Sequence, residues 1–304
     1  MNPRRIALLV ASVAAPWSWF AVRDLTAWTE VAAIGMPLIG AGCLAALLLP
    51  RSRRLRLGLV STIVMVLVAT LLPRSPAPLP PPTGETVRIM SVNVTGDNRL
   101  AGDALIDAAE ADPDVIVVLE ANPAAMKRLP ELAERYPHSI VNENVYRTTL
   151  VVLSKYPLTP IESEALTGRR LRAVTVDAPL SFTLIAAHLR RPWFYNGTSE
   201  ALPPTRQRLV EDFSEAIRSI SGPVVVAGDL NASDRGIGYR TVLEVGGLQD
   251  AMRSGWASTT SRKWWPFVLR IDHILVRGLC SEDDQVVPLT GSDHVGVVAT
   301  VGSC

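Results

Sequence analysis

Cysteine is scarce in this chain of 304 residues, which contains only three. Cys43 lies in an apolar segment, where it fits as a small buried residue, whereas Cys280 and Cys304 lie near the C-terminus. No two cysteines are spaced as Cys-x-x-Cys, and none stands in a cluster with histidine. The sequence therefore gives no indication of a zinc site.

A strong excess of charge of one sign is also missing, because the formal net charge is +1. The balance is uneven along the chain: residues 1–85 carry eight Arg and three acidic residues, which leaves about −4 for the remainder. Domains that bind nucleic acid without sequence preference usually show a clear excess of basic residues. The composition of the second part argues against that class, although local basic patches are compatible with it.

Apolar residues are abundant, at 48% of the chain, and they concentrate near the N-terminus. Three apolar runs, 6–22, 31–49 and 55–72, are each close to the roughly 20 residues that cross a bilayer. The first could instead be a cleaved signal peptide, and all three could be buried helices of a soluble protein. No small-x-small cleavage site follows the first run, so residues 1–73 are expected to be a membrane domain with three transmembrane helices.

Arginine sets the expected orientation of these helices. Arg4 and Arg5 precede the first run, and four more arginines lie between the second and the third. The positive-inside rule places the N-terminus and this loop in the cytoplasm. Three crossings then put the rest of the chain outside, which predicts a multi-pass protein of the cell membrane with an extracytoplasmic domain.

A proline-rich segment, PRSPAPLPPPTGE, separates the apolar region from the rest of the chain. Repeated proline favours an extended polyproline conformation without internal hydrogen bonds. Residues 74–86 are therefore expected to form a linker that holds a soluble domain, residues 87–304, off the membrane.

Short β-rich runs alternate with helical stretches in the soluble domain. A continuous apolar run such as 115–119 is typical of a strand in a sheet that is covered on both faces. Many strands interleaved with helices predict a layered α/β domain. The expected strands are 87–94, 115–119, 149–154, 171–176, 182–188, 223–228, 270–276 and 295–301, and the expected helices are 101–111, 124–135 and 204–219.

Polar residues that can carry chemistry stand at the ends of several of these strands. Active sites of α/β folds form where strands deliver side chains into loops. Each residue alone has an ordinary explanation as a turn, cap, core or solvated residue, and it is their occurrence together that indicates a site. The residues are Asn93, Glu120, His188, Asp229, Asn231, Asp272, Asp293 and His294.

Taken in order, these segments resemble the endonuclease/exonuclease/phosphatase superfamily with the DNase I-like fold. The resemblance rests on the Glu of VLEANP, the His of AAHL, the GDLN segment, the Asp of RIDHI and the final SDH. It covers residues about 87–302 and implies a four-layer α/β sandwich of two packed β-sheets flanked by helices. With three expected transmembrane helices in front, the chain resembles a bacterial-type member.

The resemblance also implies hydrolysis of phosphodiesters or phosphomonoesters with Mg²⁺ (or Mn²⁺) as the cofactor. Magnesium prefers oxygen ligands and keeps several waters, so a few carboxylate and amide oxygens suffice. Glu120 is expected to be the principal metal ligand, supported by Asn93 and Asp293. In many relatives Gln precedes this Glu; here Leu119 does, a departure that concerns substrate detail rather than the chemistry.

Five further residues receive catalytic roles from the resemblance. Asp229 is expected to orient or deprotonate the attacking water, and Asn231 to hydrogen-bond that water or a phosphate oxygen. His294 is expected to act as a general base or as a cation bound to phosphate, with Asp272 orienting it. His188 is expected to contact the scissile phosphate. Because neighbours alternate along a strand, His273 is expected to face away from Asp272.

Two loops that mix basic and aromatic residues are expected to border the site, RRPWFYNG at 190–197 and SRKWWPFVL at 261–269. Insertion into the membrane interface, stacking on nucleobases and ordinary packing on the domain all remain open. The acidic domain and the expected membrane tether favour the lipid bilayer over nucleic acid as the partner. The candidate substrate-binding residues are Arg147, Arg190, Arg191 and Trp193; Arg169, Arg170 and Arg172 are either further phosphate partners or part of a solvated hairpin.

The two C-terminal cysteines are a candidate disulfide. Cys280 lies eight residues beyond Asp272, and Cys304 lies ten beyond His294. If both strands run away from the catalytic end, both cysteines reach the opposite end of the domain. An extracytoplasmic location would permit a bridge between them.

The leading hypothesis is a membrane-anchored, divalent-metal-dependent phosphoesterase that acts on a phospholipid or another envelope substrate, with no protein partner inferred. An extracytoplasmic nuclease is the alternative enzyme. A catalytically inactive binding or scaffold module is the alternative of another class.

Overall fold

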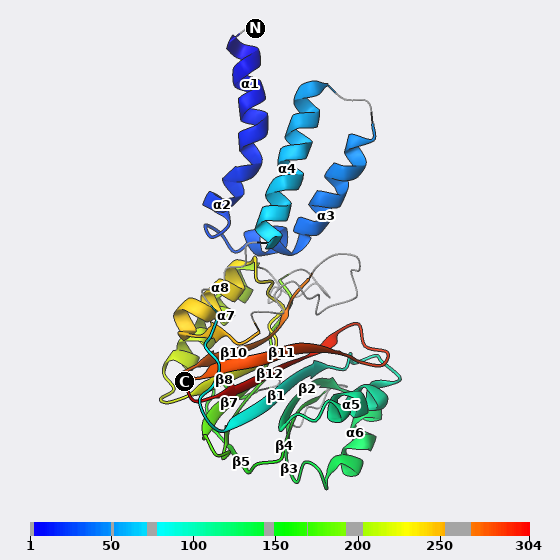
Figure 1. Cartoon of the computed structure of the whole chain (residues 1–304), viewed down its shortest axis with the longest axis vertical. Coiled ribbons are helices and arrows are strands. Elements are labelled where there is room, and N and C mark those ends of the chain that lie inside the picture. The colour runs from blue at the N-terminus through cyan, green and yellow to red at the C-terminus, as the bar shows by residue number, and fades with distance from the viewer. Residues whose placement is uncertain are drawn as a thin grey trace.

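Two six-stranded β-sheets pack face to face in the part of the chain that follows the apolar region, as seen in a computed structural model (Figure 1). Helices cover the outer face of each sheet, which gives four layers. The expected α/β sandwich is therefore confirmed. The structure describes residues 3–49, 52–71, 78–142, 149–168, 170–192, 203–252 and 269–304.

The first sheet contains a parallel pair at its centre, and its other neighbours are antiparallel. Helices α5 (Ala101–Glu110) and α6 (Pro123–Arg128) pack on its outer face. In spatial order its strands are β11 (Cys280–Pro288), β12 (Val295–Gly302), β1 (Thr86–Asn93), β2 (Val115–Ala121), β4 (Thr149–Ser154) and β3 (His138–Asn142).

The second sheet also has a parallel pair at its centre, β7 and β8. Helices α7 (Pro203–Arg218) and α8 (Ile237–Gly246) cover its outer face. In spatial order its strands are β5 (Leu158–Pro160), β6 (Leu171–Val176), β7 (Phe182–His188), β8 (Val224–Asp229), β10 (Asp272–Arg277) and β9 (Gln249–Asp250).

The core between the sheets explains the continuous apolar runs of the sequence. Every residue of β8 is buried, because this strand has the opposite sheet on one face and α7 and α8 on the other. Each large aliphatic side chain that is removed from water contributes about 1.5–3 kcal/mol to stability. This burial fixes the strands whose ends carry the polar residues.

Some expected elements differ from those observed. The expected helix 124–135 ends at Arg128 and continues as a 3-10 turn, Leu129–Leu132, because Pro130 lacks the N–H that an α-helix needs there. Helix α8 and the strands β3, β5, β9 and β11 were not expected. All four of these strands lie at sheet edges and carry polar residues, which weakens the apolar pattern on which the prediction depends.

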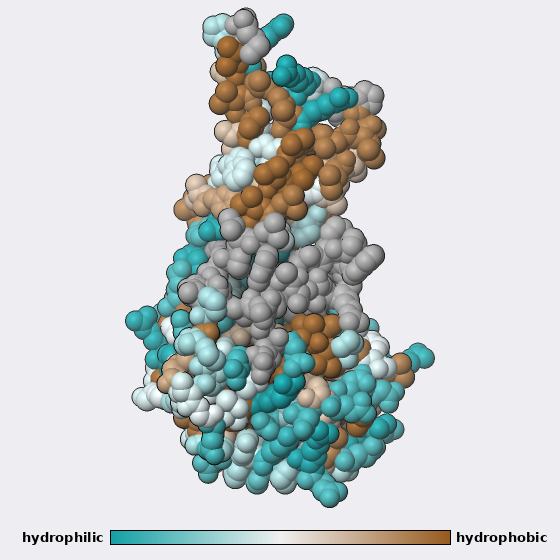
Figure 2. Space-filling model, viewed as in Figure 1, coloured by the Kyte–Doolittle hydropathy of each residue, from teal (hydrophilic) through white to brown (hydrophobic). Residues whose placement is uncertain are grey.

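The apolar N-terminal region forms helices that stand together at one end of the molecule (Figures 1 and 2). Figure 2 shows their surface as largely hydrophobic, in contrast to the hydrophilic surface of the domain. Helices α3 and α4 pack through Met36, Met65 and Val66, while Trp17 donates a hydrogen bond to the Ser61 hydroxyl, 3.0 Å away. These helices are α1 (Pro3–Ala14), a 3-10 turn (Ala15–Ser18), α2 (Trp19–Val22), α3 (Thr29–Leu47) and α4 (Arg53–Leu71).

The described residues contain two helices, rather than the three expected, that are long and apolar enough to cross a membrane. They are Pro3–Val22 and Thr29–Leu47. The expectation for 55–72 is corrected: helix α4, which contains residues 55–71, begins with Arg53, Arg54 and Arg56, and these charges shorten its uncharged part. Length and composition alone do not separate a membrane span from a signal sequence near the N-terminus.

The proline segment does not stand free of the domain along its described part. Leu79 packs against the core between the sheets, and the Pro80 carbonyl accepts a hydrogen bond from the Ser281 N–H at 3.3 Å. The Thr83 N–H donates to the Ser303 carbonyl at 2.9 Å. Residues 79–83 therefore lie along the domain instead of acting as a spacer.

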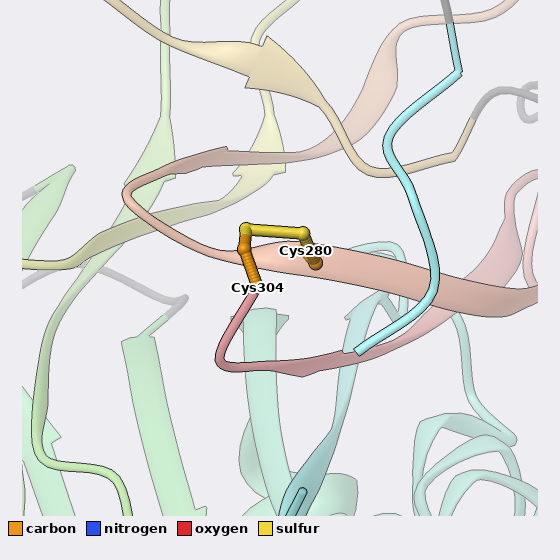
Figure 3. Close-up of a disulfide and its surroundings, with 2 residues drawn as sticks. All are labelled: Cys280 and Cys304. Carbon is orange, nitrogen blue, oxygen red and sulfur yellow. A yellow bond between two sulfur atoms is a disulfide. The ribbon is translucent and has the colours of Figure 1, made fainter. Parts of the chain in front are cut away.

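The structure contains a disulfide between Cys280 and Cys304, with Cα atoms 4.9 Å apart (Figure 3). Cys280 begins β11 and pairs in register with Gly302 at the end of β12. The bridge therefore ties the C-terminus to the edge strand of the first sheet.

Gly228 is expected to be essential for the pairing of β7 and β8. A Cβ at this position would lie 1.8 Å from the Ala187 carbonyl oxygen of β7, so the strands would have to separate. Gly228→Ala should lower the free energy of unfolding by about 3 kcal/mol, measured by denaturant titration. Gly168→Ala is the control, because its Cβ would meet nothing within 4 Å. Equal stability of the two variants would contradict this account.

The disulfide is expected to stabilise the domain. It closes a loop with a sequence separation of 24, for which loss of the bridge should cost about 3 kcal/mol. Cys304→Ser should lower the unfolding midpoint, and the same shift should follow from adding reductant to the wild type. Cys43→Ser, at the free cysteine, should change neither. Two freely reacting thiols among Cys280 and Cys304 in the unreduced folded protein would refute the bridge.

Candidate functional site

Side chains from both sheets meet at the carboxyl ends of the two parallel pairs. In the second sheet, His188 at the end of β7 lies in register with Asp229 at the end of β8. In the first sheet, Asn93 ends β1, and Glu120 follows the regular pairing of β2. The Asn93 side-chain amide joins the sheets, since it donates to Asp229 at 3.2 Å and to Glu120 at 3.4 Å.

The turn after β1 arranges three oxygen-bearing side chains. The Thr95 N–H donates to the Asn93 side-chain oxygen at 3.0 Å, and the Gly96 N–H donates to the Glu120 carboxylate at 2.8 Å. The Thr95 hydroxyl donates to Asp293. Thr95 and Glu120 both adopt left-handed backbone conformations, with φ of 62° and 56°. Such conformations are costly for residues other than glycine and are common at functional sites.

Glu120 is held as a carboxylate in this arrangement. Burial alone would raise its pKa, but His188, the Gly96 N–H and the Asn93 amide outweigh that effect, and the pKa is lowered. The His188 Nε2 lies 3.4 Å from the Glu120 carboxylate and 3.9 Å from that of Asp229. Burial lowers the pKa of His188 and outweighs the opposing effect of Asp229 and Glu120.

Asp229 is the most enclosed carboxylate of the cluster. Burial, together with repulsion from Asp272, raises its pKa. One of its oxygens accepts a hydrogen bond from the Asn231 N–H at 2.8 Å. Asn231 has a φ of 47° and donates its side-chain amide to the Leu189 carbonyl at 2.9 Å. A carboxylate with a raised pKa is a better proton acceptor than an ordinary one.

His294 is fixed between two carboxylates. Its Nδ1 lies 2.8 Å from Asp272, and its Nε2 lies 4.0 Å from Asp229 and 3.9 Å from Asp293. Burial would lower its pKa, but Asp272 and then Asp229 raise it to about 10. The expected orienting contact between Asp272 and His294 is therefore present, and the histidine is a cation.

Two groups of side chains in the described residues could hold a metal ion. Asp229, Asp272 and His294 offer ligand atoms within 4.8 Å of one another. In that group, however, the histidine is protonated and bonded to Asp272, so it has no lone pair for a metal. Glu120, Asn93 and Asp293 instead present oxygen atoms, with Glu120 ionised, and this set fits a hard cation such as Mg²⁺.

The substrate-binding residues expected from the sequence are only partly described. Arg191 lies close enough to influence the Glu120 carboxylate, and Arg170 donates to the His188 carbonyl at 3.4 Å. Arg172 lies 3.4 Å from the carboxylate of the exposed Glu162. Arg147, Arg169, Trp193 and most of both aromatic loops lie outside the described residues.

Several residues at the site were not expected from the sequence. Thr95 and Ser292 hydrogen-bond each other at 3.0 Å beneath Asn93 and Asp293. Arg206 on α7 is buried and donates to the Leu230 and Asn231 carbonyls at 2.9 and 3.1 Å. His273 faces away from Asp272, as expected, and its Nε2 lies 2.9 Å from the Ala232 carbonyl. The sequence of α7 does not distinguish Arg206 from Arg208 and Arg218, so it gives no signal that Arg206 is buried at the site.

The chain belongs to the endonuclease/exonuclease/phosphatase family, whose model matches residues 90–294. It is therefore a hydrolase that acts on phosphate esters. The superfamily expected from the sequence motifs is confirmed. Among the curated proteins compared, none matches this chain.

Solved structures support the fold. An endonuclease/exonuclease/phosphatase from Beutenbergia cavernae is 21% identical, with a TM-score of 0.55 and coverage of 72% of each chain. TDP2 of D. rerio, complexed with single-strand DNA product, is 22% identical, with a TM-score of 0.55 and coverage of 72% and 100%. Sphingomyelinase C from Streptomyces griseocarneus is 17% identical, with a TM-score of 0.51 and coverage of 71% and 99%. Identities this low establish the shared fold alone.

Asp272→Asn is expected to disable the His294 pair without disturbing the fold. The amide keeps the shape of the carboxylate but removes the charge that holds His294 protonated and oriented. We expect kcat for phosphate-ester hydrolysis to fall by about 10²-fold or more. The exposed Asp177→Asn is the matched control and should keep wild-type kcat. An Asp272→Asn enzyme with wild-type kcat would refute the assignment.

Proposed function

We propose that the chain is a membrane-anchored, divalent-metal-dependent phosphoesterase whose substrate is a phosphate ester at the surface of the bilayer. The observation that carries the catalytic part is the convergence of Glu120, Asn93, Asp229 and His294 from both sheets at one edge. In the family such carboxylate and histidine sets serve divalent-metal-dependent hydrolysis of phosphate esters. The roles that the family resemblance implies for these residues agree with the hydrogen bonds and ion pairs that they form.

A bound divalent ion, held by Glu120, Asn93 and Asp293, would neutralise the charge of the phosphate and polarise it for attack. Asp229 accepts the proton of the attacking water, which its raised pKa favours, while the Asn231 amide and His188 hydrogen-bond the water and a phosphate oxygen. His294, as a cation fixed by Asp272, stabilises the negative charge that builds up on the phosphate.

Two features of the N-terminal region support a membrane anchor over a removable signal sequence. Two helices are long and apolar enough to span a bilayer. In addition, α3 contributes buried Glu30 to the domain, whose carboxylate accepts a hydrogen bond from the Gly238 N–H at 2.7 Å. A segment that packs into the folded enzyme is better explained as part of the mature protein.

The disulfide supports an extracytoplasmic domain, because structural disulfides persist in oxidising compartments. Helix α3 begins against α8, near the loop that carries Asn231. This proximity to the bilayer favours a lipid-borne phosphate ester over a nucleic acid. An extracytoplasmic nuclease is the rival that the assay must separate.

The test is an assay of the purified full-length chain in vesicles. Substrates are phospholipids, single- and double-stranded DNA, and a small chromogenic phosphodiester, each with EDTA and after return of Mg²⁺ or Mn²⁺. We expect metal-dependent turnover that is at least about tenfold faster on phospholipid than on DNA. Faster turnover of DNA would favour the nuclease, and turnover that survives EDTA would refute the metal requirement.

Glu120→Gln is the companion variant, because it removes the charge of the proposed principal ligand while preserving its size. It should lower kcat by about 10²-fold at saturating Mg²⁺ and raise the Mg²⁺ concentration needed for half-maximal rate. Asp177→Asn serves again as the control. Unchanged metal dependence in Glu120→Gln would place the ion elsewhere.

A further inference from the structure

Glu30 is an unusual residue for the start of an apolar helix, because its side chain is almost completely buried, at 1% exposure. It lies in the first turn of α3 and caps the start of α8 through the Gly238 N–H. A second contact joins the same surfaces, since Arg235 donates to the Ala33 carbonyl at 3.3 Å. The beginning of α3 is therefore seated in the catalytic domain.

Arg206 also lies beside Gly238, on the side where a Cβ would project. A Cβ on Gly238 would lie 2.7 Å from the Arg206 Nη1 and 3.3 Å from the Glu30 carboxylate, so only glycine lets the two charged groups approach. Arg206 donates in turn to the carbonyls of Leu230 and Asn231. Arg206 thus lies between Glu30 and the loop after Asp229, and it is hydrogen-bonded to the backbone of that loop.

The charge of Glu30 matters because a buried guanidinium is costly without a counter-charge. Burial lowers the pKa of Arg206, and the acids that oppose this effect are Glu30 first and Asp229 second. Without Glu30, the remaining counter-charge for Arg206 would be the carboxylate proposed to accept the proton in catalysis. The left-handed conformation of Asn231 also requires restraint from its surroundings.

We propose that Glu30 is a positioning residue for the active site: it holds Arg206, which fixes the backbone that carries Asn231. A helix with the character of a membrane span thereby completes the frame of the catalytic loop. The inference rests on the proposed role of Asn231 but makes a structural claim that can be measured without turnover.

Kinetics of the full-length chain in detergent test the proposal. Glu30→Gln keeps an oxygen to accept from the Gly238 N–H but loses the charge that faces Arg206. We expect kcat on a small chromogenic phosphodiester to fall about tenfold, with KM and the thermal unfolding midpoint close to wild type, and Glu30→Asp to recover part of the loss. Asp24→Asn is the control, because Asp24 joins the same surfaces through an ion pair with half-buried Arg240 at 3.3 Å instead of through Arg206. It should keep wild-type kcat.

A double-mutant cycle separates positioning from a general structural effect. If Glu30 acts through Asn231, adding Glu30→Gln to Asn231→Ala should lower kcat by much less than tenfold. A full tenfold loss in that background would overturn the proposal, as would wild-type kcat in Glu30→Gln alone. A loss of activity that matches the loss of folded protein would also overturn it.

Hydrogen exchange provides the readout that does not depend on turnover. In Glu30→Gln, backbone amides in residues 229–236 should exchange at least several-fold faster than in the wild type, while those of β1 and β2 stay unchanged. Asp24→Asn should leave both regions unchanged. Unaltered exchange at 229–236 would overturn the positioning role even if the wild type hydrolysed none of the esters tested, an outcome that would refute the proposed function separately.

Discussion

The Asn93 side chain holds the two sheets in register at the site. It is buried at the end of β1 and reaches Glu120 in its own sheet and Asp229 in the other. Because an amide donates through two N–H groups, one side chain can bond both carboxylates at once. The proposed metal-binding half of the site and the proposed proton acceptor Asp229 depend on this bridge, because apolar contacts elsewhere between the sheets set the spacing of the sheets but not the alignment of these polar groups.

Buried charge is balanced pairwise around that bridge. Asp272 accompanies His294, and Asp250 binds Arg270 through two hydrogen bonds, of 2.6 and 2.8 Å, next to the site. A buried ion is tolerated when partners and hydrogen bonds replace the water it has lost. Asp229 differs from these paired carboxylates, because it shares its neighbouring histidines with other carboxylates. Burial and repulsion from Asp272 raise its pKa. Asp229 is therefore the carboxylate of this group with the raised pKa, while the charges of the two surrounding ion pairs stay fixed.

The parts of the site that the sequence predicts are local. Asn93, Glu120, His188 and Asp229 each end or follow a strand, so a strand pattern and a polar residue suffice to nominate them, and family motifs order them. Edge strands such as β3 and β5 lack a continuous apolar run, and the 3-10 turn after Arg128 depends on one proline. These were missed because short polar segments obtain their structure from neighbours rather than from their own residues.

Long-range contacts are the part that sequence reasoning could not reach. Glu30 and Gly238 are 208 positions apart, and the contact depends on the angle at which α3 meets α8. The only indication of this contact in the sequence is weak. Glu30 stands directly before the uncharged apolar run 31–49, and a residue at that place is usually assigned to the loop outside a membrane span. An ionisable group that is retained at the edge of such a run, and buried, needs a partner in the folded protein.

The same contact bears on how the proposed membrane anchor and the catalytic domain would work together. A flexible spacer would let the catalytic domain sample many distances from the bilayer. Residues 79–83 instead lie along the domain and α3 is fixed to α8, so under the proposed anchoring the site would be held at one distance and one orientation from the bilayer. Fixed placement of this kind would reduce the entropy lost when a membrane-bound substrate meets the site, and it would restrict which phosphate groups can reach it. The geometry of the proposed anchor would then act as a determinant of substrate choice, alongside the residues that surround the phosphate.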